Sequence, residues 1–212
     1  MTGVEYSAEK CNFVARKVMK QEFIPSISND DIKDLPVAGF EGKIVIVTTP
    51  EQLEEACRVL SEESIIGFDT ETRPSFKVGV SYNVSLIQLS TATTCYLIRL
   101  GSVKMERCLM HLLESRKTLK VGVDVQGDIR NLNKIRHFRA GGFVELQSEV
   151  EKYGIEDKSL RKMAAIILGV GVSKAQRLSN WEARELTAAQ LKYAATDAWI
   201  CLEMYRKLQA AK

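Results

Sequence analysis

The order of strand-like and helix-like segments is the feature that most constrains how this chain can fold. Runs rich in apolar and β-branched residues predict three consecutive strands, at residues 64–72, 84–90 and 95–100. Helical and extended patterns then alternate, at residues 104–114, 118–123, 126–138 and 143–146. Three consecutive strands indicate an antiparallel meander. The whole order, which ends in helices at residues 159–168 and 188–210, predicts an α/β fold with a mixed sheet flanked by helices.

The same capping pattern marks the start of two predicted helices. Thr49 and Gln52 stand three residues apart at the start of the first helix of the domain, as a capping box requires. Thr187 and Gln190 repeat this spacing before the last helix. A β-branched run at residues 43–48 predicts one more strand, directly before the first of these helices.

The chain divides into an N-terminal extension, residues 1–39, and one regular domain, residues 40–212. Within the extension, the pattern predicts a short amphipathic helix at residues 8–23 and one helical turn at residues 30–35. A total of 212 residues suits one α/β domain with a short extension and can bury a sizeable core.

The composition excludes several kinds of site. His111 and His137 are the only imidazoles, so a three-histidine zinc site is impossible, and neither lies in a G-x-S-x-G segment. Both are expected to be ordinary helix residues. The five cysteines are scattered without a C-x-x-C pair, which argues against zinc and disulfide frameworks and indicates buried thiols in a reducing compartment. With 27 acidic residues, we expect any chemistry to rest on carboxylates.

Location and charge narrow the possible partners. The N-terminus has no apolar segment typical of a secretory signal, and no apolar run reaches the roughly 18 residues that a membrane span needs. We therefore expect a cytoplasmic protein without membrane contact. The net charge of +3 is too small to predict a nucleic-acid partner from the whole chain. Binding to a polyanion would need a local basic face.

Asp69 and Glu71, in the segment GFDTET, are the first candidate site residues. Residues two apart on a strand point to the same face, and the stretch before them is strongly apolar. Two carboxylates at the end of a buried strand repel each other unless one takes up a proton or a cation neutralises both. A hard divalent ion with oxygen ligands meets that need. Two solvated acids at a strand end are the alternative.

Tyr193 and Asp197, in YAATDAW, are the second candidates. Their spacing of four places both on one face of the last helix, which is apolar there and is expected to pack against the sheet. An aspartate on such a face needs a partner. The alternative is a core tyrosine with a satisfied hydroxyl, beside an aspartate held by an N–H group or an arginine.

Asp128, in VGVDVQGD, is the third candidate. It lies in the first turn of a helix that follows a strand, and Gly122 at the end of that strand allows close approach. An acid at this place also favours the helix dipole, which is the alternative explanation. Asp124 competes with Asp128 for the role but is expected to be a cap or turn residue.

Taken in order, GFDTETRP, VGVDVQGD and YAATDAW resemble the three motifs of the tyrosine branch of the DEDD superfamily of 3′–5′ exonucleases. This branch includes ribonuclease D, the proofreading domain of family A DNA polymerases and the Werner-type exonucleases. The segment LSNWEARELTAAQLKYAATDAW is most similar to the Werner-type group. The resemblance covers residues 40–208. It implies a ribonuclease H-like fold and an enzyme that removes nucleoside monophosphates from a free 3′ end of DNA or RNA.

The resemblance also implies a role for each candidate. Asp69, Glu71, Asp128 and Asp197 would ligate two divalent cations, and Mg²⁺ or Mn²⁺ suits ligands that are all oxygen. Two cations would reverse the field of four carboxylates that otherwise repel a phosphodiester. Tyr193, a poor base because free tyrosine has a pKa of about 10, would orient the attacking water together with Glu71.

Basic and aromatic residues near the motifs are candidates for contacts with the nucleic acid. Those that would neutralise phosphates are Arg73, Lys77, Arg130, Lys174 and Arg177. Phe76 or Trp181 would stack on a base. The alternative is a solvated basic face, with Trp181 anchored in the core.

Two other functions compete with a 3′–5′ exonuclease. A non-catalytic nucleic-acid-binding module could keep the same fold, but the complete set of carboxylates argues against it. An endonuclease of the ribonuclease H type shares the sheet, but Tyr193 four residues before Asp197 favours the exonuclease. The sequence leaves open the choice of DNA or RNA and any protein partner.

Overall fold

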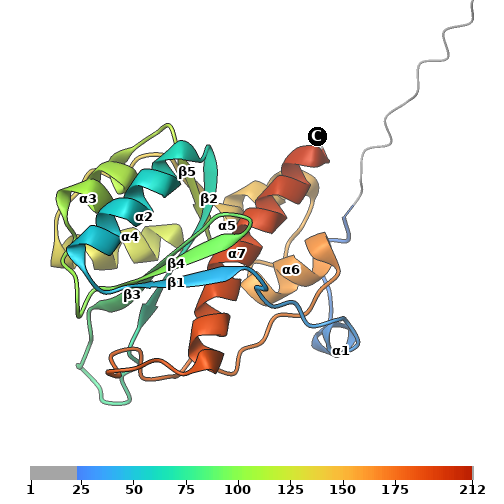
Figure 1. The fold of residues 1–212 in the computed structure, drawn as a ribbon. Helices are drawn as coiled ribbons and strands as arrows, with labels where there is room; N and C mark the ends of the chain where they lie inside the picture. The colour runs from blue at the N-terminus through green and yellow to red at the C-terminus, as the bar shows by residue number, and fades with distance from the viewer. Residues whose placement is uncertain (1–22, 212) are drawn as a thin grey trace, which may run out of the picture.

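A six-stranded mixed sheet forms the centre of the protein (Figure 1). The structure, a computed structural model, describes residues 23–211. The strands, in chain order, are β1 (Lys43–Val47), β2 (Ile65–Thr72), β3 (Val84–Ser90), β4 (Thr94–Arg99), β5 (Leu119–Gly122) and β6 (Phe143–Glu145). Their order in the sheet is β1-β4-β3-β2-β5-β6. Strands β2, β3 and β4 pair antiparallel and the remaining neighbours pair parallel, so the predicted meander and mixed sheet are confirmed.

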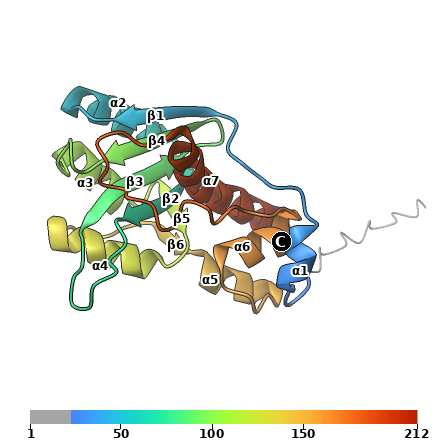
Figure 2. The same cartoon turned by 90° about the horizontal axis from the view of Figure 1, so that it is seen from below.

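Helices cover both faces of the sheet (Figure 2). On one side lie α2 (Pro50–Glu62), α3 (Arg107–Glu114) and α4 (Val125–Ile135). The long helix α7 (Ala188–Ala210) crosses the other side, with α6 (Leu160–Leu168) packed on it. Both predicted capping boxes are present, at the starts of α2 and α7. Strand β3 is buried along its whole length, because helices cover it on both faces.

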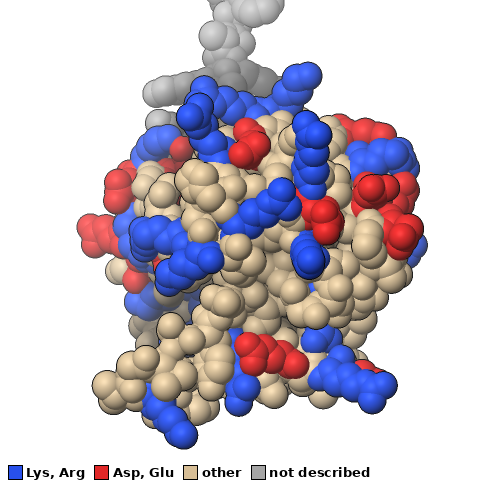
Figure 3. All heavy atoms as spheres, turned by 90° about the vertical axis from the view of Figure 1, so that its left-hand side faces the viewer, with Lys and Arg blue, Asp and Glu red and all other residues tan. Residues whose placement is uncertain are grey.

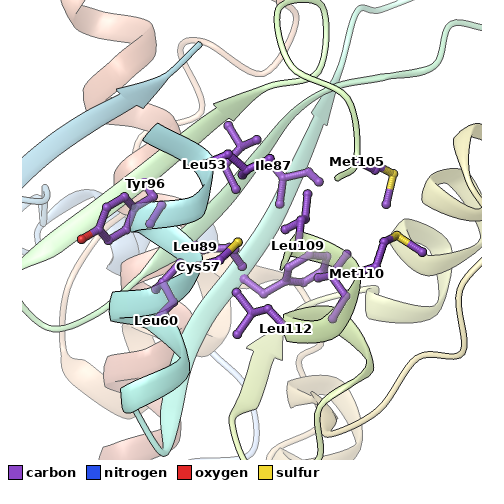
Figure 4. Close-up of a cluster of buried hydrophobic side chains, with 14 of the residues drawn as sticks. Leu53, Cys57, Leu60, Ile87, Leu89, Tyr96, Met105, Leu109, Met110 and Leu112 are labelled. Carbon is purple, nitrogen blue, oxygen red and sulfur yellow. The ribbon is translucent and has the colours of Figure 1, made fainter. Parts of the chain in front are cut away.

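The largest buried cluster lies between the sheet and helices α2 and α3 (Figure 4). Leu53 and Leu60 come from α2, Leu109 comes from α3, and Ile87 and Leu89 come from β3. Each of the five is fully buried. Burial of a leucine or isoleucine side chain contributes roughly 1.5–3 kcal/mol, so this cluster is a main source of the stability of the sheet.

Several predicted boundaries shift. Helix α3 begins at Arg107 rather than at residue 104, and α4 ends at Ile135, so His137 lies outside any helix. Helix α4 ends before Phe138, whose ring is buried in the core. The backbone N–H of Phe138 donates to the side chain of Asn133 at 2.9 Å instead of continuing the helix. The short helices α5 (Leu146–Glu149) and the 3-10 turn Val150–Tyr153 were not predicted.

The part of the N-terminal extension that the structure describes packs against the domain. Helix α1 (Asn29–Lys33) matches the turn predicted at residues 30–35, and its Ile32 is buried. Val37 forms an isolated parallel bridge with Gly171. The helix predicted at residues 8–23 lies almost entirely outside the described residues. The domain boundary at residue 40 stays a prediction.

Two absences hold for residues 23–211. None of their helices has the length and apolar character needed to cross a membrane. The four cysteines within that range are free thiols: Cys57, Cys95, Cys108 and Cys201.

Strand β2 and helix α7 approach each other without an intervening side chain. Gly67 faces the carbonyl group of Ala198, and a Cβ atom at Gly67 would overlap that oxygen. Glycine is therefore the residue that permits this backbone contact. The contact matters for function because β2 carries Asp69 and Glu71, and α7 carries Asp197.

We expect Gly67→Ala to lower the free energy of unfolding by about 3 kcal/mol, because the backbone carbonyl of Ala198 on α7 leaves no room for the methyl group. Urea denaturation measures this change. Gly101→Ala is the matched control, since a Cβ at Gly101 meets nothing within 4 Å, and it should leave the stability nearly unchanged. Equal stabilities for the two variants would contradict the close packing of β2 on α7.

Candidate active site

Three carboxylates meet where the end of β2 faces α7. Asp69 and Glu71 lie two residues apart on β2 and point to the same side, as the sequence predicted. Asp197 faces them from α7 and is 4% exposed, while the other two are half-buried. One oxygen of each carboxylate lies within 4.8 Å of the others. The alternative of two solvated acids is therefore wrong.

Burial and mutual repulsion raise the pKa of every carboxyl group in this cluster. Burial raises the pKa of Asp197 to about 7, although the hydroxyl of Tyr193 opposes the rise. Burial, with the charges of Asp69 and Asp197, raises the pKa of Glu71 to about 10. Burial and the charge of Asp197 raise the pKa of Asp69 well above its usual range. In the absence of a cation, the cluster therefore holds protons at neutral pH.

One oxygen of this cluster lacks any partner. Within residues 23–211, the buried Oδ1 of Asp197 accepts no hydrogen bond. An unsatisfied buried carboxylate oxygen is costly, typically 1–3 kcal/mol or more. Three oxygens grouped this closely, one of them with a free lone pair, fit a divalent cation with oxygen ligands. The residues present therefore suit the metal that the sequence predicted.

Asp128 approaches the cluster from the other face of the sheet. It lies in the first turn of α4, as predicted, and its Oδ1 accepts a hydrogen bond from the hydroxyl of Thr70 at 2.5 Å. Burial and the charge of Asp69 raise the pKa of Asp128 to about 8, and the Thr70 bond opposes that rise. Asp128 is near Asp69 but outside the group of three. Sequence reasoning missed Thr70, although its place between Asp69 and Glu71 directs it to the opposite face.

A sharp turn and a distant acid hold the start of α4. Asp124 has a left-handed backbone, with φ 57°, and its side chain makes no capping hydrogen bond. Glu145, at the end of β6, instead accepts hydrogen bonds from the backbone N–H groups of Asp124 and Val125, at 3.2 and 2.7 Å. The expectation that Asp124 is a cap or turn residue is confirmed, since it occupies the N-cap position of α4 in a left-handed turn. Glu145 is a second residue that sequence reasoning missed, because it lies 21 residues after Asp124 in the chain.

Tyr193 lies beside this cluster and rests on a buried tryptophan. Its ring centroid is 6.0 Å from that of Trp181, which is fully buried. Stacking of Trp181 on a base is therefore wrong, and the core alternative is confirmed. Tyr193 and Asp197 also line a cavity of about 230 Å³, bounded by residues 37–39, 172–173 and 175–176.

The predicted substrate contacts do not belong to the cluster of three carboxylates. Arg73 forms an ion pair with Glu182 at 3.1 Å and lies over the ring of Tyr82 at 4.7 Å. Lys174 and Arg177 are exposed on the segment that leads to α7. Phe76 is 82% exposed on the loop between β2 and β3, and this loop lines a cavity of about 310 Å³ together with Leu178. Contacts of these residues with nucleic acid stay predictions.

A sequence model described as 3′–5′ exonuclease matches residues 44–211. The chain belongs to the 3′–5′ exonuclease family. The exonuclease domain is 34% identical, over 185 residues, to the bifunctional 3′–5′ exonuclease/ATP-dependent helicase WRN of Mus musculus. That match covers 82% of this chain but only 13% of the mouse protein. The resemblance stated from the three motifs is thereby confirmed.

Solved structures show the same fold. The exonuclease domain matches the Nibbler EXO domain of Aedes aegypti with a TM-score of 0.74 and 24% identity, over 82% of this chain and 92% of that one. It matches RNase D of Escherichia coli with a TM-score of 0.72 and 22% identity, over 80% of this chain and 45% of that one. The predicted fold class, a ribonuclease H-like sheet typical of 3′–5′ exonucleases, is confirmed.

The raised pKa values predict how stability depends on pH when cations are removed by a chelator. Glu71 holds its proton up to a pH of about 10 in the folded protein, against 4.5 ordinarily, so the folded state binds more protons between these values. Stability is therefore fully present at low pH and is lost as pH rises. We expect Glu71→Gln to flatten this decline by roughly 1 kcal/mol between about pH 6 and 8, measured by urea denaturation.

The control for this prediction is Glu54→Gln, which changes an exposed acid on α2. It should show the same decline as the unmodified protein. A decline that Glu71→Gln leaves unchanged would show that Glu71 does not titrate in the way its burial predicts.

Proposed function

We propose that this exonuclease domain hydrolyses the phosphodiester bond at a free 3′ end of DNA or RNA and releases nucleoside monophosphates, with two bound divalent cations, Mg²⁺ or Mn²⁺. The observation that supports it most is the cluster of Asp69, Glu71 and Asp197, whose oxygens lie within 4.8 Å. A phosphodiester is anionic, so these carboxylates require cations before they can receive it. When bound, the cations offset the carboxylate charge and make water acidic enough to supply a nucleophile near neutral pH.

The four acids divide between the two proposed cations. Asp69, Glu71 and Asp197 would hold the first, because their oxygens share one site and Asp197 has a free lone pair. Asp69 and Asp128 would hold the second, directly or through water. Thr70 keeps Asp128 in place by donating to Oδ1, which leaves Oδ2 of Asp128 available. A non-catalytic module has no need of all four acids.

Tyr193 acts as a hydrogen-bond donor in this proposal. Burial and the charge of Asp197 raise the pKa of its hydroxyl above the usual value, so the hydroxyl keeps its proton at neutral pH and cannot be the base. It can orient the attacking water, together with Glu71. Trp181 beneath the ring limits its movement. The cytoplasmic location stays a prediction from the sequence.

We expect Asp69→Ala to abolish degradation of a labelled oligonucleotide with a free 3′ end while the protein stays folded, because the change removes a repelling charge. Mg²⁺ or Mn²⁺ should raise the melting temperature of the unmodified protein and of the Glu54→Gln control, but much less that of Asp69→Ala. A 3′-protected oligonucleotide should resist the unmodified protein. Internal cuts would indicate an endonuclease instead, and binding without cutting would indicate a non-catalytic module.

Tyr193→Phe should lower kcat about 100-fold, since the ring still packs on Trp181 but can no longer orient water. The rise in melting temperature on addition of Mg²⁺ should be unaffected, because Tyr193 is not a proposed ligand. Single-turnover kinetics and a thermal scan measure the two effects. Unchanged kinetics would remove the role assigned to the hydroxyl.

A further inference from the structure

The positive charge of this chain is concentrated in one segment. Residues 104–139 contain nine Lys and Arg against four Asp and Glu, a net charge of +5, whereas the whole chain carries +3. The remainder of the chain is therefore net negative, at −2. Both histidines also lie in this segment. The small overall charge thus conceals a strong separation of charge along the sequence.

Eight of these nine basic residues are exposed, and we call them the basic face. They are Lys104, Arg107, Arg116, Lys117, Arg130, Lys134, Arg136 and Arg139. Within residues 23–211, none of the eight forms an ion pair, whereas Lys and Arg elsewhere form all the ion pairs present. Glu106, Glu114 and Asp124 lie among them and lower the local charge without cancelling it. Figure 3 shows Lys and Arg side chains spread over this side of the molecule.

The tertiary structure joins α3, α4 and the segment after α4 into one surface. The guanidinium of Arg136 donates to the carbonyl of Met105 at 2.5 Å, just before α3. The backbone N–H of Arg139 donates to the side chain of Glu114 at 2.9 Å, at the end of α3. The segment after α4 therefore runs along the whole of α3 and brings its basic residues alongside those of that helix.

The basic face includes residues of α4, the helix that also carries Asp128. Arg130 stands two residues after Asp128 on α4, and Lys134 follows one turn later on the same helix. The face then continues over the segment after α4 and along α3. Helix α3 alone is about 12 Å long, which equals the rise of three to four base pairs. A nucleic acid whose 3′ end lies at the carboxylates can therefore reach these residues with its upstream part.

The chemistry of the basic face suits paired rather than single strands. Proteins grip single strands by stacking exposed aromatic rings on bases, in addition to neutralising phosphates. Phe138, in the middle of the segment, is buried, and Phe76 is the one large apolar aromatic side chain exposed among residues 23–211. Phe76 lies instead on the loop between β2 and β3. Apart from the small imidazoles of His111 and His137, the basic face exposes no aromatic ring within residues 23–211. Its contacts are therefore mainly with backbone phosphates, which line the outside of a duplex.

We propose that the basic face binds the phosphate backbone of a double-stranded region behind the 3′ end that is being removed. The substrate class is then a nucleic acid with a duplex stem and a free 3′ end. This inference rests on the proposed function, because the active site decides where the 3′ end lies. It also supplies the local basic face that binding to a polyanion requires.

The test compares two substrates that share one labelled 3′ end. One is a hairpin with a single-stranded 3′ tail, and the other is the same tail without the stem. The variant carries Lys134→Ala and Arg139→Ala. The matched control carries Lys43→Ala in β1 and Lys207→Ala in α7, two exposed lysines that form no ion pair within residues 23–211. We expect the variant to raise KM for the hairpin about tenfold and to leave the tail alone unchanged. The control should change neither.

Salt dependence gives a second measure of the same contacts. Loss of two phosphate contacts should reduce the slope of log Kd against log salt by about two for the hairpin. Equal losses on both substrates would overturn the duplex assignment, and no loss on either would overturn the proposal. A thermal scan of both variants shows that they remain folded.

Failure of the proposed function can be distinguished from failure of this inference. If the unmodified protein degrades neither substrate, the proposed function fails. Fluorescence anisotropy with a labelled blunt duplex in the presence of a chelator still tests the basic face, since it needs no catalysis. Equal duplex affinity for the variant and the unmodified protein would then overturn the inference.

Discussion

The contact between β2 and α7 determines where three of the four acidic groups of the site lie. It forms because Gly67 has no side chain, so the strand backbone reaches the Ala198 carbonyl. From that contact, the strand alternation directs Asp69 and Glu71 toward the helix, and the helix directs Asp197 toward the strand. On the other face of the sheet, the core packs against α2 and α3. Three mutually repelling carboxylates are held together by the rest of the fold.

The buried carboxylate of Asp197 differs from the buried ammonium of Lys120 in its hydrogen bonding. Lys120 is fully buried, yet its ammonium group donates to three carbonyls, those of Leu112, Ser115 and Thr118. Burial lowers the pKa of Lys120 to about 8, and its hydrogen bonds give it a structural role at the end of α3. Asp197 is buried almost as deeply, and its Oδ1 has no hydrogen-bond partner among residues 23–211. A satisfied buried charge stabilises a fold, whereas an unsatisfied one indicates a place for a ligand.

Acidic and basic residues lie at different distances from the candidate active site. Near the carboxylates, Arg73 is already paired with Glu182, and the field is set by acids that require cations. Farther along α4, Arg130 and Lys134 form no ion pair within residues 23–211, and the first of them lies within one turn of Asp128. The proposed substrate would therefore meet cations at its 3′ end and guanidinium and ammonium groups upstream. The bound cations and the basic side chains would both attract the same phosphate backbone. The net charge of +3 does not show this separation of acidic and basic groups.

Local periodicity determined much of this protein from the sequence alone. The order of the elements, both capping boxes, the shared face of Asp69 and Glu71, and the spacing of Tyr193 and Asp197 depend only on neighbours within a few residues. These features follow from the fixed repeats of strands and helices. The three motifs also sufficed to indicate the family.

Only the tertiary structure decided how distant segments meet. It placed Thr70 against Asp128, buried Trp181 under Tyr193, and made Glu145 rather than Asp124 hold the start of α4. It also joined basic residues of α3 and α4 into one face. Each of these depends on packing between segments far apart in the chain, which no local pattern encodes. The sequence identified the side chains of the site, and the tertiary structure determined which residues they contact.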